Sequence, residues 1–488
     1  MKIGFDNDKY LSIQSEHIKE RIAQFKGKLY LELGGKLFDD HHASRVLPGF
    51  QPDSKLRMFS KISDHIEIVI VISAEDIVKN KVRADLGITY DEDVLRLRDE
   101  FIGRGFMVGS VVITHYNGQH AANDYRTRLE RLGIKSYVHY LIDGYPHNVS
   151  LIASDDGFGQ NDYVETERPL VIVTAPGPGS GKMAVCLSQL YNEHKRGVEA
   201  GYAKFETFPV WSLPLKHPVN IAYEAATADL NDVNMIDPFH LEAYGKIAIN
   251  YNRDIEIFPV LNALFEGIYG HNPYKSPTDM GVNMVGFCIS DDDVCSEASR
   301  QEIIRRYYDA TNKFALGANN EDEVQKIQLL FNQAKITTDD RRVTVAAKER
   351  RDKSGGTPCA AIELADGTII TAESSELLGS CAALLLNAMK HLAGIDHAVK
   401  LIPQNMIEPI QKMKVEYLQG KNPRLHTDEV LVALSVLSQV NDTCVKALEK
   451  LPELQGCQTH ATVMLSEVDR KILKKLGVGL TCEPVRKA

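Results

Sequence analysis

LVIVTAPGPGSGKM, residues 170–183, carries the clearest fold signal in this chain. Residues 170–174 are apolar and rich in β-branched side chains, which is typical of a strand buried on both faces of a parallel sheet. The glycine-rich turn that follows leads into a helix, which we expect from Met183 to about Arg196. A strand, a glycine-rich turn and a helix in this order predict a βαβ unit whose turn can bind an anion.

The same alternation of strand and helix runs through the first 237 residues. Further strands are predicted at residues 29–33, 66–72, 110–114 and 137–142. Strands that alternate with helices of ten or more residues indicate a mostly parallel sheet with flanking helices. We therefore expect residues 1–237 to form one α/β domain that contains the glycine-rich turn.

Three further segments complete the predicted organisation. Residues 238–338 are expected to form a mainly helical domain. Residues 339–356 combine a charge cluster with Ser-Gly-Gly, which favours a linker or mobile loop. Residues 357–488 begin with a hairpin about Asp366-Gly367 and continue with a strongly apolar helix, which indicates a smaller C-terminal α/β domain. The fold class is therefore α/β and multidomain.

Length and charge exclude several classes of protein. The 488 residues exceed what one hydrophobic core usually organises. Lysine and arginine total 56 against 66 aspartate and glutamate, so the net charge is −10. A sequence-independent nucleic-acid binder needs a basic surface to displace counterions from phosphates, so we expect no nucleic-acid partner.

The chain has no sequence signal for a membrane or an oxidising compartment. Its first residues lack an apolar signal-peptide core, and the aliphatic runs 66–72 and 382–389 are too short to span a bilayer. The eight cysteines are scattered and include no CxxC pair, which argues against a disulfide framework and a zinc knuckle. These features predict a cytoplasmic protein with no membrane partner and no metal ligands.

The glycine-rich turn provides the candidate binding residues. Glycines allow consecutive backbone N–H groups to point inward, the helix N-terminus adds positive potential, and Lys182 can reach a terminal phosphate. The candidate cofactor-binding residues are Thr174, Gly177, Gly179, Ser180, Gly181 and Lys182. The alternative is a tight strand-to-helix turn with an exposed lysine.

Two residues depart from the phosphate-loop pattern GxxxxGK[ST]. Pro176 stands where the pattern has its first glycine, although Gly177 is adjacent. Met183 replaces the hydroxyl that binds magnesium, so a standard magnesium–nucleotide geometry is not predicted unless Ser180 or Thr174 compensates. We expect a nucleotide as the ligand, without a standard magnesium site.

Two residues join Lys182 as candidate catalytic groups. Asp237 follows a short apolar run, so it is a candidate for holding a metal or a nucleophile. Because Pro238 follows it, Asp237 is equally well explained as the N-cap of a helix. His115, with Asn117, follows the strand 110–114, and ligands of open α/β sheets lie beyond the carboxyl ends of the strands.

Two other polar segments have both a functional and a structural interpretation. Lys36, His41, His42 and Arg45 follow the strand 29–33 in the same manner as His115 follows its strand. Residues 274–283 could fold over a phosphate as a lid. For both segments a solvated surface loop is the alternative, and it is the one that turn-forming residues favour.

The C-terminal segment has two features that suggest catalysis only at first inspection. Thr371-Ala372-Glu373 loosely resembles the deaminase arrangement, but Thr stands in place of the zinc ligand and no PCxxC follows. Cys381 lies at a predicted helix start, where its pKa could be lowered, but the apolar residues 382–386 favour a buried, inert thiol.

The chain resembles an uncharacterised bacterial family of cytosolic proteins with a domain of unknown function. The resemblance rests on the length of the chain and on three segments, Leu29–Phe38, Leu170–Met183 and Tyr274–Asn283. The resemblance covers nearly the whole chain. It implies a multidomain α/β protein with a helical insert and a C-terminal part of deaminase-like topology without the zinc site. It implies no activity, substrate or catalytic residue.

The glycine-rich turn with Lys182 therefore supports two functional hypotheses. The first is an enzyme that binds a phosphorylated small molecule, a nucleotide in particular, and transfers a phosphoryl or nucleotidyl group to a small metabolite. The second is a non-catalytic sensor or scaffold that binds such a molecule without turnover, which the loss of the hydroxyl at Met183 favours. The sequence is compatible with a homo-oligomer as well as with a monomer.

Overall fold

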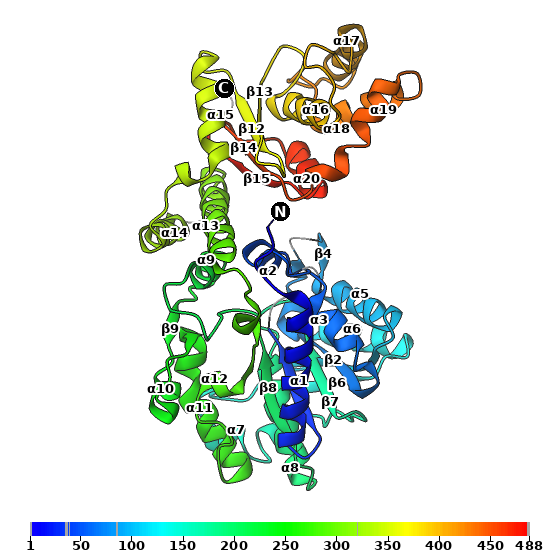
Figure 1. The fold of residues 1–488 in the computed structure, drawn as a ribbon. Coiled ribbons are helices and arrows are strands. Elements are labelled where there is room, and N and C mark those ends of the chain that lie inside the picture. The colour runs from blue at the N-terminus through cyan, green and yellow to red at the C-terminus, as the bar shows by residue number, and fades with distance from the viewer. Residues whose placement is uncertain (1, 35–37, 39, 84–85, 320, 486–488) are drawn as a thin grey trace. The chain divides into compact units, whose positions relative to one another are not determined.

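The computed structural model describes residues 2–34, 38, 40–83, 86–319 and 321–485 (Figure 1). They form two compact units, Lys2–Ser299 and Arg300–Ala488. The division falls inside helix α13 (Asp292–Ala315), whereas the predicted domain boundaries lie near residues 238 and 356.

The first unit is built on a seven-stranded sheet with the order β11-β8-β1-β7-β2-β5-β6. Every neighbouring pair of strands in it is parallel, which confirms the predicted α/β class. The strands are β1 (Leu29–Leu33), β2 (Ile66–Ser73), β5 (Met107–Tyr116), β6 (Ser136–Tyr140), β7 (Leu170–Thr174), β8 (Gly201–Phe205) and β11 (Gly281–Val282).

Helices cover both faces of this sheet, as Figure 1 shows. Side chains of a strand alternate between the faces, so Leu29 and Leu31 of β1 enter one apolar core and Tyr30 enters the other. The first core is covered by α1 (Asn7–Gln24), α3 (Ser54–Ser60), α5 (Tyr90–Gly103) and α6 (His120–Arg131). The second is covered by α7 (Val149–Ile152), α8 (Lys182–Lys195) and α11 (Asn252–Tyr269).

The connections of the two central strands run in opposite directions. The chain leaves β1 across β7 toward β2, and it leaves β7 across β1 toward β8. Helix α3 of the first connection and α8 of the second accordingly lie on opposite faces of the sheet. The carboxyl ends of β1 and β7 therefore form a topological switch point, where open α/β sheets bind their ligands.

The remaining elements of the first unit surround this sheet. Residues 238–299 do not form a separate helical domain, because the apolar face of α11 packs in the same core as α8 and β11 joins the main sheet. The other elements are α2 (His41–Val46), α4 (Ala74–Val78), β3 (Val82–Arg83), β4 (Ile88–Thr89), α9 (Pro218–Ala226), β9 (Asn234–Ile236), α10 (Pro238–Tyr244), β10 (Ile249–Tyr251) and α12 (Pro277–Met280).

The second unit contains a four-stranded sheet with the order β13-β12-β14-β15. The predicted hairpin is present as β12 (Cys359–Glu363) and β13 (Ile369–Glu373), and its sheet is completed by β14 (Gln458–Ala461) and β15 (Gly479–Cys482). Its helices are α14 (Glu321–Ala334), α15 (Arg342–Lys353), α16 (Ser380–Leu392), α17 (Gln404–Lys412), α18 (Thr427–Leu437), α19 (Asp442–Leu448) and α20 (Glu467–Lys475). No helix in the described ranges is long and apolar enough to cross a membrane.

Helix α15 corrects the prediction of a linker at residues 339–356. Val343 and Ala347 lie one turn apart on the buried side of α15 and pack against Ala361 of β12. Apart from the buried Arg341 just before the helix, the charged residues of the segment lie on the more exposed side of α15. A charge run with few apolar residues resembles a linker in sequence because only two small side chains mark the buried face.

A buried ion pair joins α18 to α20 in the second unit. Asp469 accepts hydrogen bonds from His426 Nδ1 at 2.9 Å, Ser466 Oγ at 2.8 Å and the Thr427 amide at 2.9 Å. The hydrogen bond to Asp469 raises the pKa of His426 above its usual value of 6.5. The imidazolium form of His426 is therefore stabilised by the fold.

Stability of the second unit is expected to depend on pH through His426. A histidine whose pKa is raised in the folded state stabilises the fold below its unfolded pKa, and this stabilisation disappears as pH rises through the folded value. In urea unfolding followed by circular dichroism, His426→Asn should cost more stability at about pH 5.5 than at about pH 9. Equal costs at both pH values would contradict a role for the charged ring.

Candidate functional site

The glycine-rich loop between β7 and α8 lies at the switch point of the sheet. Gly179 has φ +74° and Gly181 has φ +85°, a backbone region that side chains with a Cβ rarely adopt. Gly177 is needed for a different reason, because a Cβ at this position would lie 2.3 Å from the Tyr90 hydroxyl. Each glycine of the predicted motif therefore has a structural requirement.

The loop presents backbone N–H groups that have no acceptor. Over the described residues, the N–H groups of Gly179, Gly181, Lys182, Met183 and Ala184 make no hydrogen bond to the protein. Gly181 is the N-cap of the 14-residue helix α8 and has no side chain with which to cap it. The first turn of the helix therefore keeps its donors and its positive potential for solvent or a ligand.

The loop conformation is held by two hydroxyl groups. Ser180 Oγ donates to Gly177 O at 2.9 Å, and Thr114 Oγ1 donates to Ser180 O at 2.7 Å. The Ser180 side chain is buried, and its proton is used inside the loop. Thr114 belongs to β5, so the carboxyl end of that strand is tied directly to the loop.

His115, one residue after Thr114, lies at the same edge of the sheet. Its backbone has φ +50°, which is uncommon for a residue with a Cβ, and its Nδ1 is 3.0 Å from Ser73 Oγ at the end of β2. Strained backbone is found preferentially at functional positions. Asn117, in contrast, is exposed and belongs to the turn that leads to α6.

Sequence reasoning missed two polar residues of this edge. Ser73 ends the buried strand β2, and Glu32 is a charged residue inside the apolar strand β1. Glu32 lies opposite Val173 in the sheet register and accepts a hydrogen bond from Tyr202 OH at 2.7 Å. Each could have been found as a polar side chain within or directly after an otherwise apolar strand.

Asp237 is the N-cap of α10. Its Oδ1 accepts from the amides of Phe239 and His240 at 3.0 Å, and its Oδ2 accepts from the amide and the hydroxyl of Thr278. The carboxylate is fully buried, and among the described residues none of its hydrogen bonds comes from the glycine-rich loop. The capping interpretation is therefore confirmed, since these hydrogen bonds connect Asp237 to α10 and to Thr278.

The cluster after β1 is described only in part. Lys36 lies outside the described residues. His41 and Arg45 are exposed on the short helix α2, and the ring of His42 packs against Phe208 at 5.0 Å. The preceding residue Asp40 caps α2 and forms a buried ion pair with Lys55.

Residues 274–283 include a short helix and the edge strand of the main sheet. Tyr274 is buried, and its hydroxyl group bonds to the backbone of Tyr202 in β8. The segment continues as α12 and as β11, which pairs with β8. The turn-forming residues of this segment concealed the edge strand in the sequence.

In the second unit, the Cys381 side chain is buried in the apolar core that includes α16. Burial, followed by the charge of Asp469, raises the pKa of the Cys381 thiol well above its usual value. This confirms the predicted burial of the Cys381 thiol. Across the described residues, no group of three or more His, Cys, Asp or Glu side chains is arranged to hold a metal ion.

The close contact at Gly177 gives a testable prediction. Gly177→Ala should lower the free energy of unfolding by about 1–3 kcal/mol, because the new Cβ overlaps the buried Tyr90 ring. Tyr90→Leu in the same chain should recover part of that loss. Gly103→Ala is the control, since a Cβ there meets nothing within 4 Å. Additive costs of the Gly177 and Tyr90 changes in urea unfolding would contradict the overlap.

Comparison with known proteins assigns the chain to a family. Residues 3–335 match the family model "Domain of unknown function DUF1846, N-terminal", and residues 339–488 match "Domain of unknown function DUF1846, C-terminal". The chain belongs to the DUF1846 family. This confirms the resemblance inferred from the sequence, and the junction of the two DUF1846 models lies just before α15.

Bacterial relatives match the chain over nearly its full length. The UPF0371 protein cu0538 of Corynebacterium urealyticum is 57% identical over 99% of this chain and 97% of its own length. A UPF0371 protein of Streptococcus thermophilus and UPF0371 protein SUB1165 of Streptococcus uberis are each 54% identical over 99% of this chain and 98% of their own length. The DUF1846 chain thus has relatives of the same architecture whose names state no activity.

Proposed function

We propose that this protein binds a phosphorylated small molecule, a nucleotide in particular, on the loop between β7 and α8. The observation that carries the proposal is the row of backbone N–H groups at residues 179–184 that have no protein acceptor in the described structure. These donors lie at the N-terminus of a 14-residue helix and at the switch point of a parallel sheet. Phosphate oxygens satisfy such donors, and the helix dipole favours their charge.

Lys182 supplies the positive charge of the proposed site. It is the first residue of α8 and is half-buried, and no carboxylate within the described part of the chain pairs with it. A lysine beside unpaired amides neutralises phosphate charge without first breaking an ion pair. Lys182 and the loop amides therefore act together on the same phosphate group.

Transfer of a phosphoryl or nucleotidyl group to a small metabolite is the reaction that this arrangement supports. Lys182 and the loop amides would stabilise the charge that develops on the phosphate oxygens. His115 and Ser73 lie at the end of neighbouring strands, where they can contact the second substrate. We propose Lys182 and His115 as the catalytic residues and leave Asp237 out of the proposed site, because its hydrogen bonds within the described structure support α10 and Thr278.

One observation favours a sensor that binds the ligand without turnover. Met183 occupies the position of the magnesium-binding hydroxyl, and the Ser180 proton is used inside the loop. A ligand held only by amides and Lys182 would bind equally well without magnesium. The magnesium dependence of binding and the formation of product therefore distinguish the two functions.

The test measures ligand affinity by calorimetry for ATP, GTP, NAD, coenzyme A and glucose 6-phosphate, each with and without magnesium. Lys182→Ala should weaken binding of at least one of them by about 10–100-fold, the value of one charge-assisted contact. Lys195→Ala is the matched control, because Lys195 lies in the last turn of the same helix and pairs with Asp155. It should leave the affinity unchanged.

Each result of this test has a defined meaning. Binding that depends on Lys182 supports the proposed site, and release of a diphosphate or a monophosphate product assigns turnover to it. Binding without product in any arm assigns the sensor. If no ligand binds the wild type, or if binding is the same after Lys182→Ala, the proposed function is wrong.

A further inference from the structure

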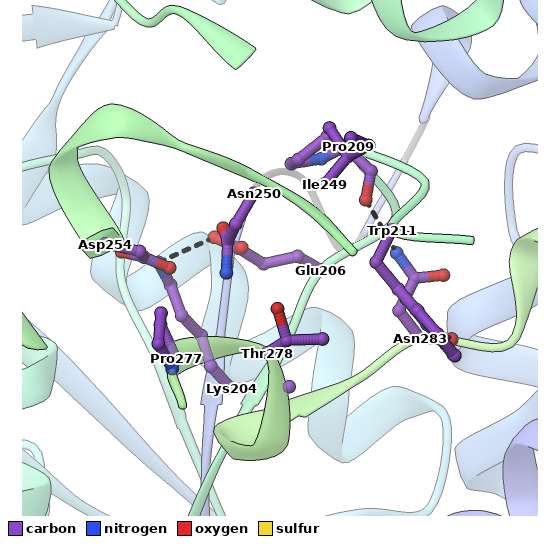
Figure 2. A pocket seen from close by; sticks show the side chains of 11 residues that line it. Lys204, Glu206, Pro209, Trp211, Ile249, Asn250, Asp254, Pro277, Thr278 and Asn283 are labelled. Carbon is purple, nitrogen blue, oxygen red and sulfur yellow. Dashed lines mark hydrogen bonds and ion pairs between the residues drawn. The ribbon is translucent and has the colours of Figure 1, made fainter. Parts of the chain in front are cut away.

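A second polar cluster lies at the carboxyl end of β8, on the side of the sheet that α11 covers (Figure 2). Lys204 Nζ lies 2.8 Å from both carboxylate oxygens of Asp254 and 2.9 Å from Glu206 Oε1, and it also bonds to the Tyr251 hydroxyl. Tyr251 and Asp254 are buried. Lys204 and Glu206 are partly buried, and removing such charged groups from water is costly unless they are paired.

The cluster borders a cavity of about 40 Å³. Trp211, Pro209 and Pro277 give it apolar walls, while Glu206 and Asn250 give it polar ones, and Figure 2 shows their side chains around it. A single water molecule needs about 10–15 Å³ of cavity volume, so this cavity has room for roughly three non-hydrogen atoms. It can therefore admit the end of a small molecule but not a whole nucleotide.

One carboxylate oxygen of Glu206 makes no hydrogen bond or ion pair with the residues that the structure describes. Its Oε1 accepts a hydrogen bond from Tyr251 OH at 2.6 Å and contacts the Lys204 ammonium. Its Oε2 has no partner among the described residues, and the Glu206 side chain lines the cavity. An oxygen with free lone pairs in a cavity with apolar walls is positioned to accept a hydrogen bond from a ligand.

The environment of Glu206 adjusts its proton affinity to neutral pH. Burial raises the pKa of the Glu206 carboxyl, Lys204 lowers it and Asp254 raises it further, and the resulting pKa is about 7. Tyr251 donates to the carboxylate and favours its charged form, while the nearby Tyr223 is neutral because burial raises its own pKa. A carboxylate with a pKa near the working pH is well suited to accept a proton in catalysis.

The cavity and the glycine-rich loop follow the carboxyl ends of two strands, β8 and β7, that are separated in the sheet by β1 alone. Successive side chains of β8 point to opposite faces of the sheet. Ala203 and Phe205 enter the core that α1 and α3 cover, so Lys204, between them, lies on the face that α8 covers. Strand β8 is two positions from β7, which corresponds to about 10 Å between the two strands. The charge of Glu32 in β1, between them, contributes to raising the pKa values of both Cys186 in α8 and Lys204.

We infer that this cavity receives the hydroxyl-bearing end of a neutral small molecule, and that Glu206 binds this hydroxyl and takes its proton. The inference deepens the proposed function and rests on it for the identity of the second reactant. The apolar walls favour the carbon atoms of such a molecule, and Glu206 Oε2 and the Asn250 amide favour its oxygen. The substrate class is therefore an alcohol or polyol that accepts the transferred group.

The transfer step balances with a nucleoside triphosphate as the second reactant. The acceptor oxygen forms a bond to the terminal phosphorus, and the bond from that phosphorus to the nucleoside diphosphate breaks with its electron pair. The hydroxyl proton passes to Glu206 Oε2, and the leaving diphosphate remains with the loop amides and Lys182. The products are a phosphorylated alcohol and a nucleoside diphosphate.

The position of the chain's single tryptophan makes this inference directly testable. Trp211 lines the cavity, so its fluorescence reports whether the cavity is occupied. Glycerol, ribose, glucose and myo-inositol are titrated to about 50 mM, and 1,2-dimethoxyethane serves as the probe that lacks a hydroxyl. At least one polyol should give a saturable change in wild-type fluorescence, and dimethoxyethane should bind at least about 10-fold more weakly.

Variants then assign the binding to Glu206. Glu206→Gln should weaken the affinity for the polyol by at least about 10-fold. Glu206→Asp, which keeps the charge, provides a second variant if the Glu206→Gln protein does not fold. Glu256→Gln on the exposed side of α11 is the control and should bind as the wild type. A wild type that responds to no polyol, or a response unchanged by both Glu206 variants, would overturn the inference.

Lys182→Ala separates this inference from the proposed function. The variant should retain the Trp211 response to the polyol, because the cavity does not include the loop. Once a polyol that binds is identified, it should stimulate release of the diphosphate from ATP, and Glu206→Gln should reduce that rate by about 10²–10⁴-fold. Polyol binding without stimulated release would leave the cavity assigned but would overturn the role of Glu206 as the base.

Discussion

Asp237→Ala is expected to lower the free energy of unfolding of the first unit by about 3–5 kcal/mol. The substitution leaves three backbone N–H groups and the Thr278 hydroxyl without their acceptor. Asp237 is fully buried, so water cannot replace the lost carboxylate without opening the structure. The measurement is urea unfolding followed by Trp211 fluorescence, since Trp211 belongs to this unit.

Asp237→Asn is the matched variant. Its remaining oxygen can still cap Phe239 and His240, but its amide nitrogen cannot accept from Thr278, so about half of the loss is expected. Both variants should bind the loop ligand with wild-type affinity at temperatures where they are folded. A stable Asp237→Ala protein with lost ligand binding or turnover would instead show that Asp237 belongs to the chemistry.

Arg341→Met is expected to lower the stability of the second unit by about 3–5 kcal/mol. The Arg341 guanidinium is fully buried and donates to Thr481 Oγ1, Thr459 O and Gly479 O, which connects the start of α15 to β14 and β15. Burial, followed by the charge of Arg305, lowers its pKa to about 10, so it is still charged at neutral pH. Methionine fills the volume but leaves these acceptors unpaired.

Arg342→Met is the control for this prediction. Arg342 is the next residue in the chain, but its side chain is largely exposed and pairs with Glu363 at the surface, so its loss should cost less than about 1 kcal/mol. Hydrogen exchange measured by mass spectrometry on β14 and β15 locates the effect. Similar protection of these strands in both variants would contradict the structural role of Arg341.

Much of the first unit was predictable because its signals are local. The strand at residues 170–174, its glycine-rich turn and the following helix are adjacent in sequence, and their backbone requirements are specific. The strand at residues 66–72 was predicted because an apolar run rich in β-branched residues is typical of a buried strand, and the strand at residues 29–33 because a short, mostly apolar run is followed directly by Gly34-Gly35. Family membership also followed from the sequence.

Errors arose where one composition fits two structures. The charged segment 339–356 was predicted as a linker and forms α15, because only Val343 and Ala347 mark its buried side. For Asp237 the sequence left two interpretations equal, a helix cap and a functional carboxylate, and the structure shows the cap. Residues 274–283 are rich in turn formers, yet two of them extend the sheet as β11.

Local sequence patterns suffice for the βαβ class and for the loop with its glycines and Lys182, because hydrophobic periodicity and backbone freedom are properties of neighbouring residues. The tertiary structure alone sets the strand order, which places β1 and β7 at a switch point. It also decided that Glu206 packs against Gly34 at the end of β1 and that Lys204 meets Asp254 beside a cavity. These contacts join residues far apart in the chain, and they are fixed by the burial of whole sheet faces, which no local pattern encodes.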